Sequence, residues 1–189
     1  EYYAGSERMR RGEPPEENLA RAAFLARTAI RRAPDNARAY DRLGLAYSAA
    51  LEQASVSGGD VEVWYGQAVR ALERAVELDP TYAHTLDHGG RVHRQFGWWE
   101  WQQGRDPAGA WEAAIRAFER ASAIREESVF VSDLGNVYLD LGQYREDRGL
   151  DGLADAGRAV ESFESALRLG REDQYAGPYA QVSLGTALA

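Results

Sequence analysis

Apolar and small residues recur along this chain at the three- and four-residue spacing that is typical of amphipathic helices. The pattern is clearest between Asn36 and Pro80, where two helical stretches are joined by a turn-rich link. The sequence nowhere alternates polar and apolar residues in the way of a half-buried strand. We therefore expect an all-helical fold.

The pair of helical stretches repeats along the sequence. In the first helix the marker is a glycine followed three residues later by a large residue, as in Gly44 with Tyr47. This glycine recurs as Gly90, Gly135 and Gly185, at intervals of 46, 45 and 50 residues. The second helix is marked by three positions, of which the first and last are alanine and the middle one is alanine, leucine or phenylalanine. The sets are Ala22, Ala26, Ala29; Ala68, Leu72, Ala75; Ala114, Phe118, Ala121; and Ala159, Phe163, Ala166. The recurrence predicts a repeat of about 45 residues built from two helices.

A further set of glycines sets the lengths of the helices. Each stands ten residues before the small residue that opens the second-helix marker, and the set is Gly12, Gly58, Gly104 and Gly149. Glycine ends a helix well because it adopts the left-handed conformation without a Cβ clash. After one of these glycines, Asp106 and Pro107 have the order of an N-cap followed by the first helical residue. We expect a first helix of about 20 residues and a second of about 18 in each unit.

These residues together resemble the tetratricopeptide repeat (TPR), whose signature is an aromatic, a Leu-Gly pair and a Tyr, followed by Ala, Phe, Ala and Pro. The matching positions are Tyr40, Leu43, Gly44, Tyr47, Ala68, Leu72, Ala75 and Pro80; then Leu86, Gly90, Ala114, Phe118 and Ala121; then Leu134, Gly135, Tyr138, Ala159, Phe163 and Ala166. The second unit departs from the signature at Gly89, His93 and Glu126. The units are also longer than the family's, which have about 34 residues.

The resemblance implies an all-α fold, an α-solenoid of antiparallel helix pairs that winds into a right-handed superhelix. Its expected parts are a half repeat at 1–35 that holds a second helix, repeats at 36–80, 81–126 and 127–172, and a half repeat at 173–189 that holds a first helix.

In TPR proteins the first helices line the concave face, so the resemblance also implies a binding surface made of their polar residues. Those residues are Arg38, Asp41, His84, Asp87, Arg91, Arg94, Asn136 and Asp140. Of the clamp that some members use to hold two carboxylates, only Asn136 and Arg91 have counterparts here. The set therefore fits a mixed polar groove for a protein or peptide better than a carboxylate clamp.

Composition and charge exclude several functions. The 189 residues carry a formal charge of −8, whereas nucleic acids and anionic membrane surfaces require a basic face. All 22 basic residues are Arg, and Cys is absent, so thiol nucleophiles, Schiff-base amines and thiolate metal sites are excluded. The sequence contains no apolar stretch long enough to span a bilayer. The compartment stays open, because a secreted protein after signal cleavage and a cytoplasmic one both fit.

Three histidines fall on one expected helix. His84, His88 and Asp87 have a spacing that a metal could use, but surface histidines are the better interpretation, and His93 stands in the packed Tyr position of the motif. With no catalytic constellation in the sequence, we expect a non-enzymatic protein without a metal or cofactor.

Tryptophans crowd the second unit at Trp98, Trp99 and Trp101. Successive helical residues point about 100° apart, so these three cannot share one face. We expect at least one of them to face another unit or another molecule.

The two half repeats at the ends match each other. Written after the C-terminal half repeat of one copy, the N-terminal half repeat of another completes a unit of 48 residues between Gly185 and Gly44. We therefore expect copies of the chain to stack head to tail into a filament or tube, through an interface that includes Tyr2, Tyr3, Leu19, Ala22, Ala26, Val182, Leu184 and Leu188. The alternative is that the sequence is a piece of a longer array that serves as a peptide-binding adaptor.

Overall fold

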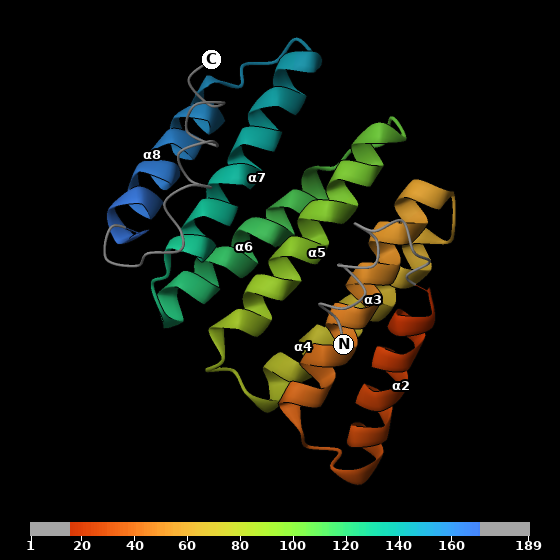
Figure 1. Cartoon of the computed structure of the whole chain (residues 1–189). Coiled ribbons are helices and arrows are strands. Elements are labelled where there is room, and N and C mark those ends of the chain that lie inside the picture. The colour runs from red at the N-terminus through yellow and green to blue at the C-terminus, as the bar shows by residue number, and fades with distance from the viewer. Residues whose placement is uncertain (1–15, 171–189) are drawn as a thin grey trace. The chain divides into compact units, whose positions relative to one another are not determined.

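The structure of the chain is a computed structural model that describes residues 16–170. Every regular element in this range is a helix, which confirms the all-α prediction for the described part of the chain (Figure 1). The helices are α2 (Glu16–Arg32), α3 (Ala37–Ser57), α4 (Val61–Leu78), α5 (Ala83–Gln102), α6 (Ala108–Ile124), α7 (Ser128–Asp147) and α8 (Leu153–Gly170). The first helices of the repeats have 20 or 21 residues and the second helices 17 or 18, as the spacing of glycines predicted.

The chain forms two compact structural units, each larger than one repeat, which divide within α5 between Phe96 and Gly97. We call these two parts of the chain the first unit and the second unit. In the first unit, α3 packs against both α2 and α4. In the second unit, α7 packs against both α6 and α8. Each unit is thus organised around a first helix that contacts the second helix of its own repeat and the second helix of the repeat before it.

The turns between paired helices follow the sequence signals closely. Gly58, Gly104 and Gly149 have φ angles of 80°, 71° and 70°, in the left-handed region where a Cβ would be strained. One detail of the prediction is wrong by a residue: α6 begins at Ala108, and Pro107 precedes it. Asp106 still caps this helix, because its carboxylate accepts a hydrogen bond of 3.1 Å from the Ala108 amide.

The core of the second unit shows why the motif combines small and large residues. Trp111, Phe118 and Val137 are fully buried in one cluster with Leu141. Between α7 and α8, the backbone at Gly135 lies directly over the ring of Phe163, so that a Cβ at residue 135 would stand only 2.7 Å from the ring. The glycine therefore allows the two helices to approach closely enough to enclose a phenylalanine.

Between residues 16 and 170, none of the helices combines the length and the hydropathy that a membrane span requires.

Candidate protein-interaction site

The predicted concave-face residues of the first unit include a carboxylate that holds two helices together. Asp41 on α3 is only 3% exposed, and its Oδ1 accepts a hydrogen bond of 3.1 Å from the Thr85 hydroxyl of α5. The same oxygen lies 2.8 Å from Nδ1 of His88. A buried carboxylate needs such partners, so Asp41 links the first helices of successive repeats.

Other members of this set are also held by neighbours in the first unit. Asp87 is buried on α5 and pairs with Arg91 one turn later, at 3.3 Å between Oδ2 and Nε. The Arg38 guanidinium lies 5.6 Å from the centre of the Tyr82 ring, and the His84 ring meets the same tyrosine edge to face at 5.4 Å. Arg38 and Arg91 are both exposed, so their charges reach solvent.

The remaining members differ in their exposure to solvent. Arg94 on α5 is half-buried. In the second unit, Asn136 and Asp140 stand one helical turn apart on α7, where Asn136 is half-buried and Asp140 is 5% exposed. The three carboxylates of the predicted set are therefore all buried, whereas the predicted cations are exposed or half-buried.

The histidines take up individual contacts. His84 contacts Tyr82 and His88 contacts Asp41. His93, in the motif's Tyr position, has its Nδ1 2.8 Å from the Tyr65 hydroxyl. Within residues 16–170, no three His, Asp or Glu side chains gather into a group that could hold a metal ion.

The tryptophans of α5 in the second unit have distinct environments. Trp101 and Trp98 both contact the fully buried Trp111, with ring centres 5.8 Å and 6.4 Å away. Trp99 carries the Arg105 guanidinium over its ring at 4.7 Å. Trp98 is partly exposed, so it is the tryptophan of this group that is best placed for the external contact we predicted.

Helix α2 presents an apolar surface that differs from that of the other second helices. We call Ala22, Leu25 and Ala29 the α2 stripe, because their spacing of three and four residues places them on one face. The equivalent residues of α4 are Ala68, Ala71 and Ala75, which are buried, and α4 packs against the first helix of its own repeat. In the α2 stripe, by contrast, Leu25 is 46% exposed and both alanines are only half-buried.

Phe24 enlarges this apolar surface. It is 60% exposed, and the other second helices carry charged residues at the equivalent position, which are Arg70, Arg116 and Glu161. Sequence reasoning overlooked both Phe24 and Leu25. The signal was present, since Phe24 replaces a charged residue of the repeat and Leu25 follows Ala22 by three positions.

The predicted assembly residues fall in two groups. Leu19 and Ala26 on α2 are buried in the described structure, whereas Ala22 is half-buried in the α2 stripe. The others lie outside the described residues, and they are Tyr2, Tyr3, Val182, Leu184 and Leu188.

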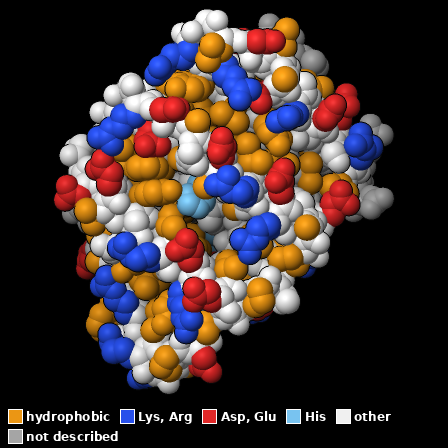
Figure 2. All heavy atoms as spheres, turned by 180° about the vertical axis from the view of Figure 1, so that it is seen from behind, with side chains coloured by type: hydrophobic (Ala, Val, Ile, Leu, Met, Phe, Trp, Pro, Cys, Tyr) orange, Lys and Arg blue, Asp and Glu red, His pale blue; other side chains and the backbone are white. Residues whose placement is uncertain are grey.

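Charges of both signs cover the described surface. On the face that Figure 2 shows, Arg side chains alternate with Asp and Glu side chains, and apolar side chains fill the spaces between them. Among the described residues on this face, neither sign forms a continuous patch.

Comparisons with known proteins support the fold. No protein-family model and no curated protein matches the sequence. Among solved structures, the chain resembles TTC0263, a thermophilic TPR protein of Thermus thermophilus, with 20% identity, a TM-score of 0.63, and coverage of 99% of this chain and 79% of that one. It also resembles PilF of Pseudomonas aeruginosa, with 20% identity, a TM-score of 0.59, and coverage of 99% and 65%. The MamA protein is a third match, with 20% identity, a TM-score of 0.53, and coverage of 97% and 76%.

The repeats are therefore TPR-like, as the motif predicted, and the fold is that of an all-helical TPR solenoid.

Proposed function

We propose that this chain is a non-enzymatic scaffold that binds protein, and that its partner at the α2 stripe is a further copy of the chain. The observation that carries the proposal is the exposure of Leu25, which is 46% exposed on α2, whereas its counterpart Ala71 on α4 is buried. TPR-like second helices are built to pack against a first helix, and α2 keeps that packing face although part of it meets solvent.

The repeat pattern supports a first helix of another copy as the occupant of the α2 stripe. A first helix of this protein carries a glycine followed three residues later by a large side chain, and Gly185 and Leu188 reproduce that marker within 173–189. Residues 176–189 contain no charged side chain. Such a segment suits an apolar stripe, because burying one leucine side chain contributes about 1.5–3 kcal/mol.

The two surfaces belong to different parts of the chain, so the contact is heterologous. A heterologous contact repeats from copy to copy and produces an open filament unless its rotation closes into a ring. The proposed assembly is therefore a head-to-tail polymer in which 173–189 of one copy packs on α2 of the next.

The adaptor function, in which the polar set binds a foreign peptide, has less support. Asp41 already serves Thr85 and His88, and Asp87 pairs with Arg91. Carboxylates that are buried in this way stabilise the packing of the helices and offer little to a ligand.

Sedimentation velocity over a wide range of protein concentration tests the proposal. The parent should form larger species as its concentration rises, and Leu25→Arg should remain a monomer, because a charged side chain would have to be buried without a partner. Val56→Arg is the matched control, since Val56 is 87% exposed on α3 and lies outside the stripe. The proposal fails if the parent stays monomeric throughout, or if Leu25→Arg assembles as readily as the control.

A further inference from the structure

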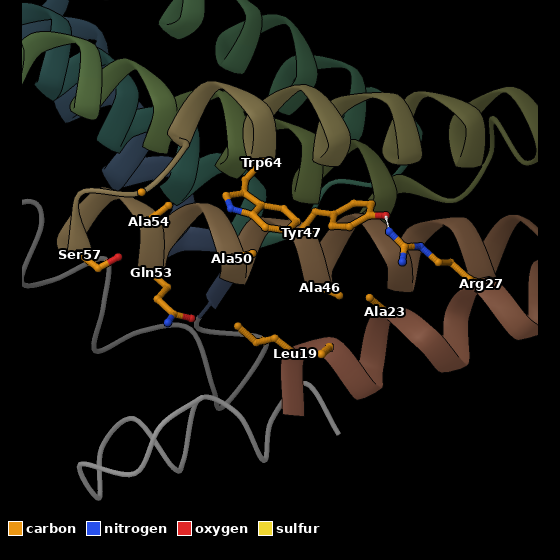
Figure 3. A pocket seen from close by; sticks show the side chains of 12 residues that line it. Leu19, Ala23, Arg27, Ala46, Tyr47, Ala50, Gln53, Ala54, Ser57 and Trp64 are labelled. Carbon is orange, nitrogen blue, oxygen red and sulfur yellow. Dashed lines mark hydrogen bonds between the residues drawn. The ribbon is translucent and has the colours of Figure 1, made fainter. Parts of the chain in front are cut away.

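The first unit contains an open pocket with a volume of about 450 Å³ where α2, α3 and the start of α4 meet. Figure 3 shows its lining: Leu19 comes from α2, Ala50 and Gln53 come from α3, and Trp64 comes from α4. Tyr47 forms part of the wall, with its ring 5.9 Å from that of Trp64. The pocket is therefore mostly apolar and has aromatic side chains along one side, as is usual for ligand sites.

Helices α4 and α5 fill the equivalent space with their own aromatic rings. Moving 46 residues along the sequence, Leu19 corresponds to Tyr65 and Ala50 corresponds to Phe96. These two rings are stacked, with centres 3.8 Å apart and planes inclined by 7°. Where α4 and α5 provide two stacked rings, α2 and α3 provide a leucine and an alanine.

Helices α6 and α7 fill the equivalent space in a related way. Trp111 occupies the position of Leu19, and Tyr144 occupies the position of Gln53. Their rings meet edge to face at 5.9 Å, and Trp111 is fully buried. Two of the three equivalent sites in the described chain are thus occupied by aromatic side chains, and Leu19, Ala50 and Gln53 take their place in the first.

Arg27 also lines the pocket and brings a positive charge with hydrogen-bond donors to it. The Arg27 Nη2 donates a hydrogen bond of 2.5 Å to the Tyr47 hydroxyl, and the guanidinium lies 5.6 Å from the centre of that ring. The other second helices carry glutamate at this position, at Glu73, Glu119 and Glu164. Within residues 16–170 Arg27 has no ion pair. Because a guanidinium has five N–H donors, Arg27 can donate a further hydrogen bond to an acceptor on a bound group.

We infer that this pocket binds an aromatic side chain, tyrosine or tryptophan, of a partner polypeptide, and that Arg27 donates a hydrogen bond to an oxygen of the same segment. The rings that fill the equivalent sites are themselves protein side chains, so the space has the shape that a side chain on a backbone requires. Aromatic side chains are also the common anchors of protein interfaces. The pocket lies between helices and does not include the α2 stripe, so this site does not depend on head-to-tail assembly.

An NMR titration tests the inference with N-acetyl-L-tyrosinamide as the probe and N-acetyl-L-leucinamide as its aliphatic control. The readout is the indole N–H resonance of Trp64, which is identified by its loss in Trp64→Phe. The tyrosine amide should shift this resonance saturably, and the leucine amide should bind several-fold more weakly. Arg27→Met should weaken binding of the tyrosine amide several-fold, because methionine has no N–H group to donate to the acceptor.

Filling the pocket from within supplies the decisive variant. Ala50→Phe introduces the residue of the next repeat and should abolish binding of the probe, whereas Val56→Phe on the exposed side of α3 should leave it unchanged. If circular dichroism shows that Ala50→Phe does not fold, Leu19→Tyr takes its place as the filling variant. The inference is overturned if the filled variant binds as well as the parent, if both amides bind equally, or if no saturable shift occurs. Tighter binding of 4-hydroxyphenylacetate than of the tyrosine amide would also overturn it, since the site would then favour a small aromatic acid.

Discussion

The contact between Gly135 and Phe163 allows the packing of the repeat to be tested by a single methyl group. In Gly135→Ala the new Cβ would stand 2.7 Å from Cε1 and 2.9 Å from Cδ1 of Phe163, closer than carbon atoms approach in folded proteins. Phe163 is fully buried, so its ring has no space into which it can withdraw. Overpacking of this kind costs about 1–3 kcal/mol. Because alanine favours a helix over glycine by about 1 kcal/mol, the net loss should be about 0–2 kcal/mol.

Gly157→Ala is the matched control in the same unit. Gly157 lies on the exposed face of α8, and a Cβ there would have no atom within 4 Å. The substitution should raise the free energy of unfolding by about 0.5–1 kcal/mol, since only the helix preference changes. The same chemical change should therefore have opposite effects at two glycines of one unit.

Urea denaturation followed by circular dichroism measures both effects as shifts of the midpoint. A third variant identifies the cause: in Gly135→Ala/Phe163→Leu the smaller side chain should relieve the overlap, so the double variant should lose less stability than the two single losses added together. The reasoning is refuted if Gly135→Ala is as stable as Gly157→Ala, or if the two substitutions at the contact are simply additive.

Two further outcomes follow from polar groups in the core. Burial, assisted by the Asp106 carboxylate that accepts its hydrogen bond at 3.1 Å, raises the pKa of Tyr144 above its usual range. Tyr144 therefore stabilises the fold below about pH 10, where an unfolded tyrosine keeps its proton, and loses this contribution as the pH rises toward its folded pKa. Urea midpoints against pH should thus fall more steeply above about pH 10 for the parent than for Tyr144→Phe, and parallel curves would contradict this. Asp41→Ala should lower stability by about 1–3 kcal/mol, because Thr85 and His88 lose a buried acceptor, and an unchanged midpoint would show that the link is dispensable.

Asp60→Ala is the control for Asp41→Ala. Asp60 precedes α4 but is exposed and forms no side-chain hydrogen bond with the helix end. Its loss should change the urea midpoint much less than the loss of Asp41.

The helices and their turns could be predicted because their causes are local. Gly58, Gly104 and Gly149 end first helices through their own backbone freedom, and the helix lengths follow from where they stand. The close contact of Gly135 with Phe163 was foreseeable as well, since the motif pairs a glycine with a large residue one helix later. These features depend on neighbouring residues and on a repeat that the sequence displays several times.

The polar network could not be predicted, because its cause is not local. Asp41 and His88 are 47 residues apart, and nothing in either helix alone indicates that a carboxylate and an imidazole will meet. The motif placed both on first helices but could not say that the carboxylate would be buried. The TPR resemblance suggested that Asp41 belongs to a binding groove, and the structure adds that its carboxylate joins two helices.

The pocket could be predicted from the sequence only in part. Its existence depends on the difference between Ala50 and Phe96, which the sequence contains, and on the stacking of Phe96 with Tyr65, which only the structure reveals. Aligning the repeats shows where residues differ, but the structure shows which of those differences leave a space.

Complementation between two defective copies tests the central claim, head-to-tail association, most directly. Leu25→Arg disables the α2 stripe but leaves 173–189 intact, and Leu184→Arg does the reverse. Each variant alone should be monomeric in light scattering coupled to size exclusion, and an equimolar mixture should form a heterodimer and nothing larger, because each pair has one working surface of each kind. A mixture that stays monomeric, or variants that each dimerise alone, would contradict head-to-tail assembly.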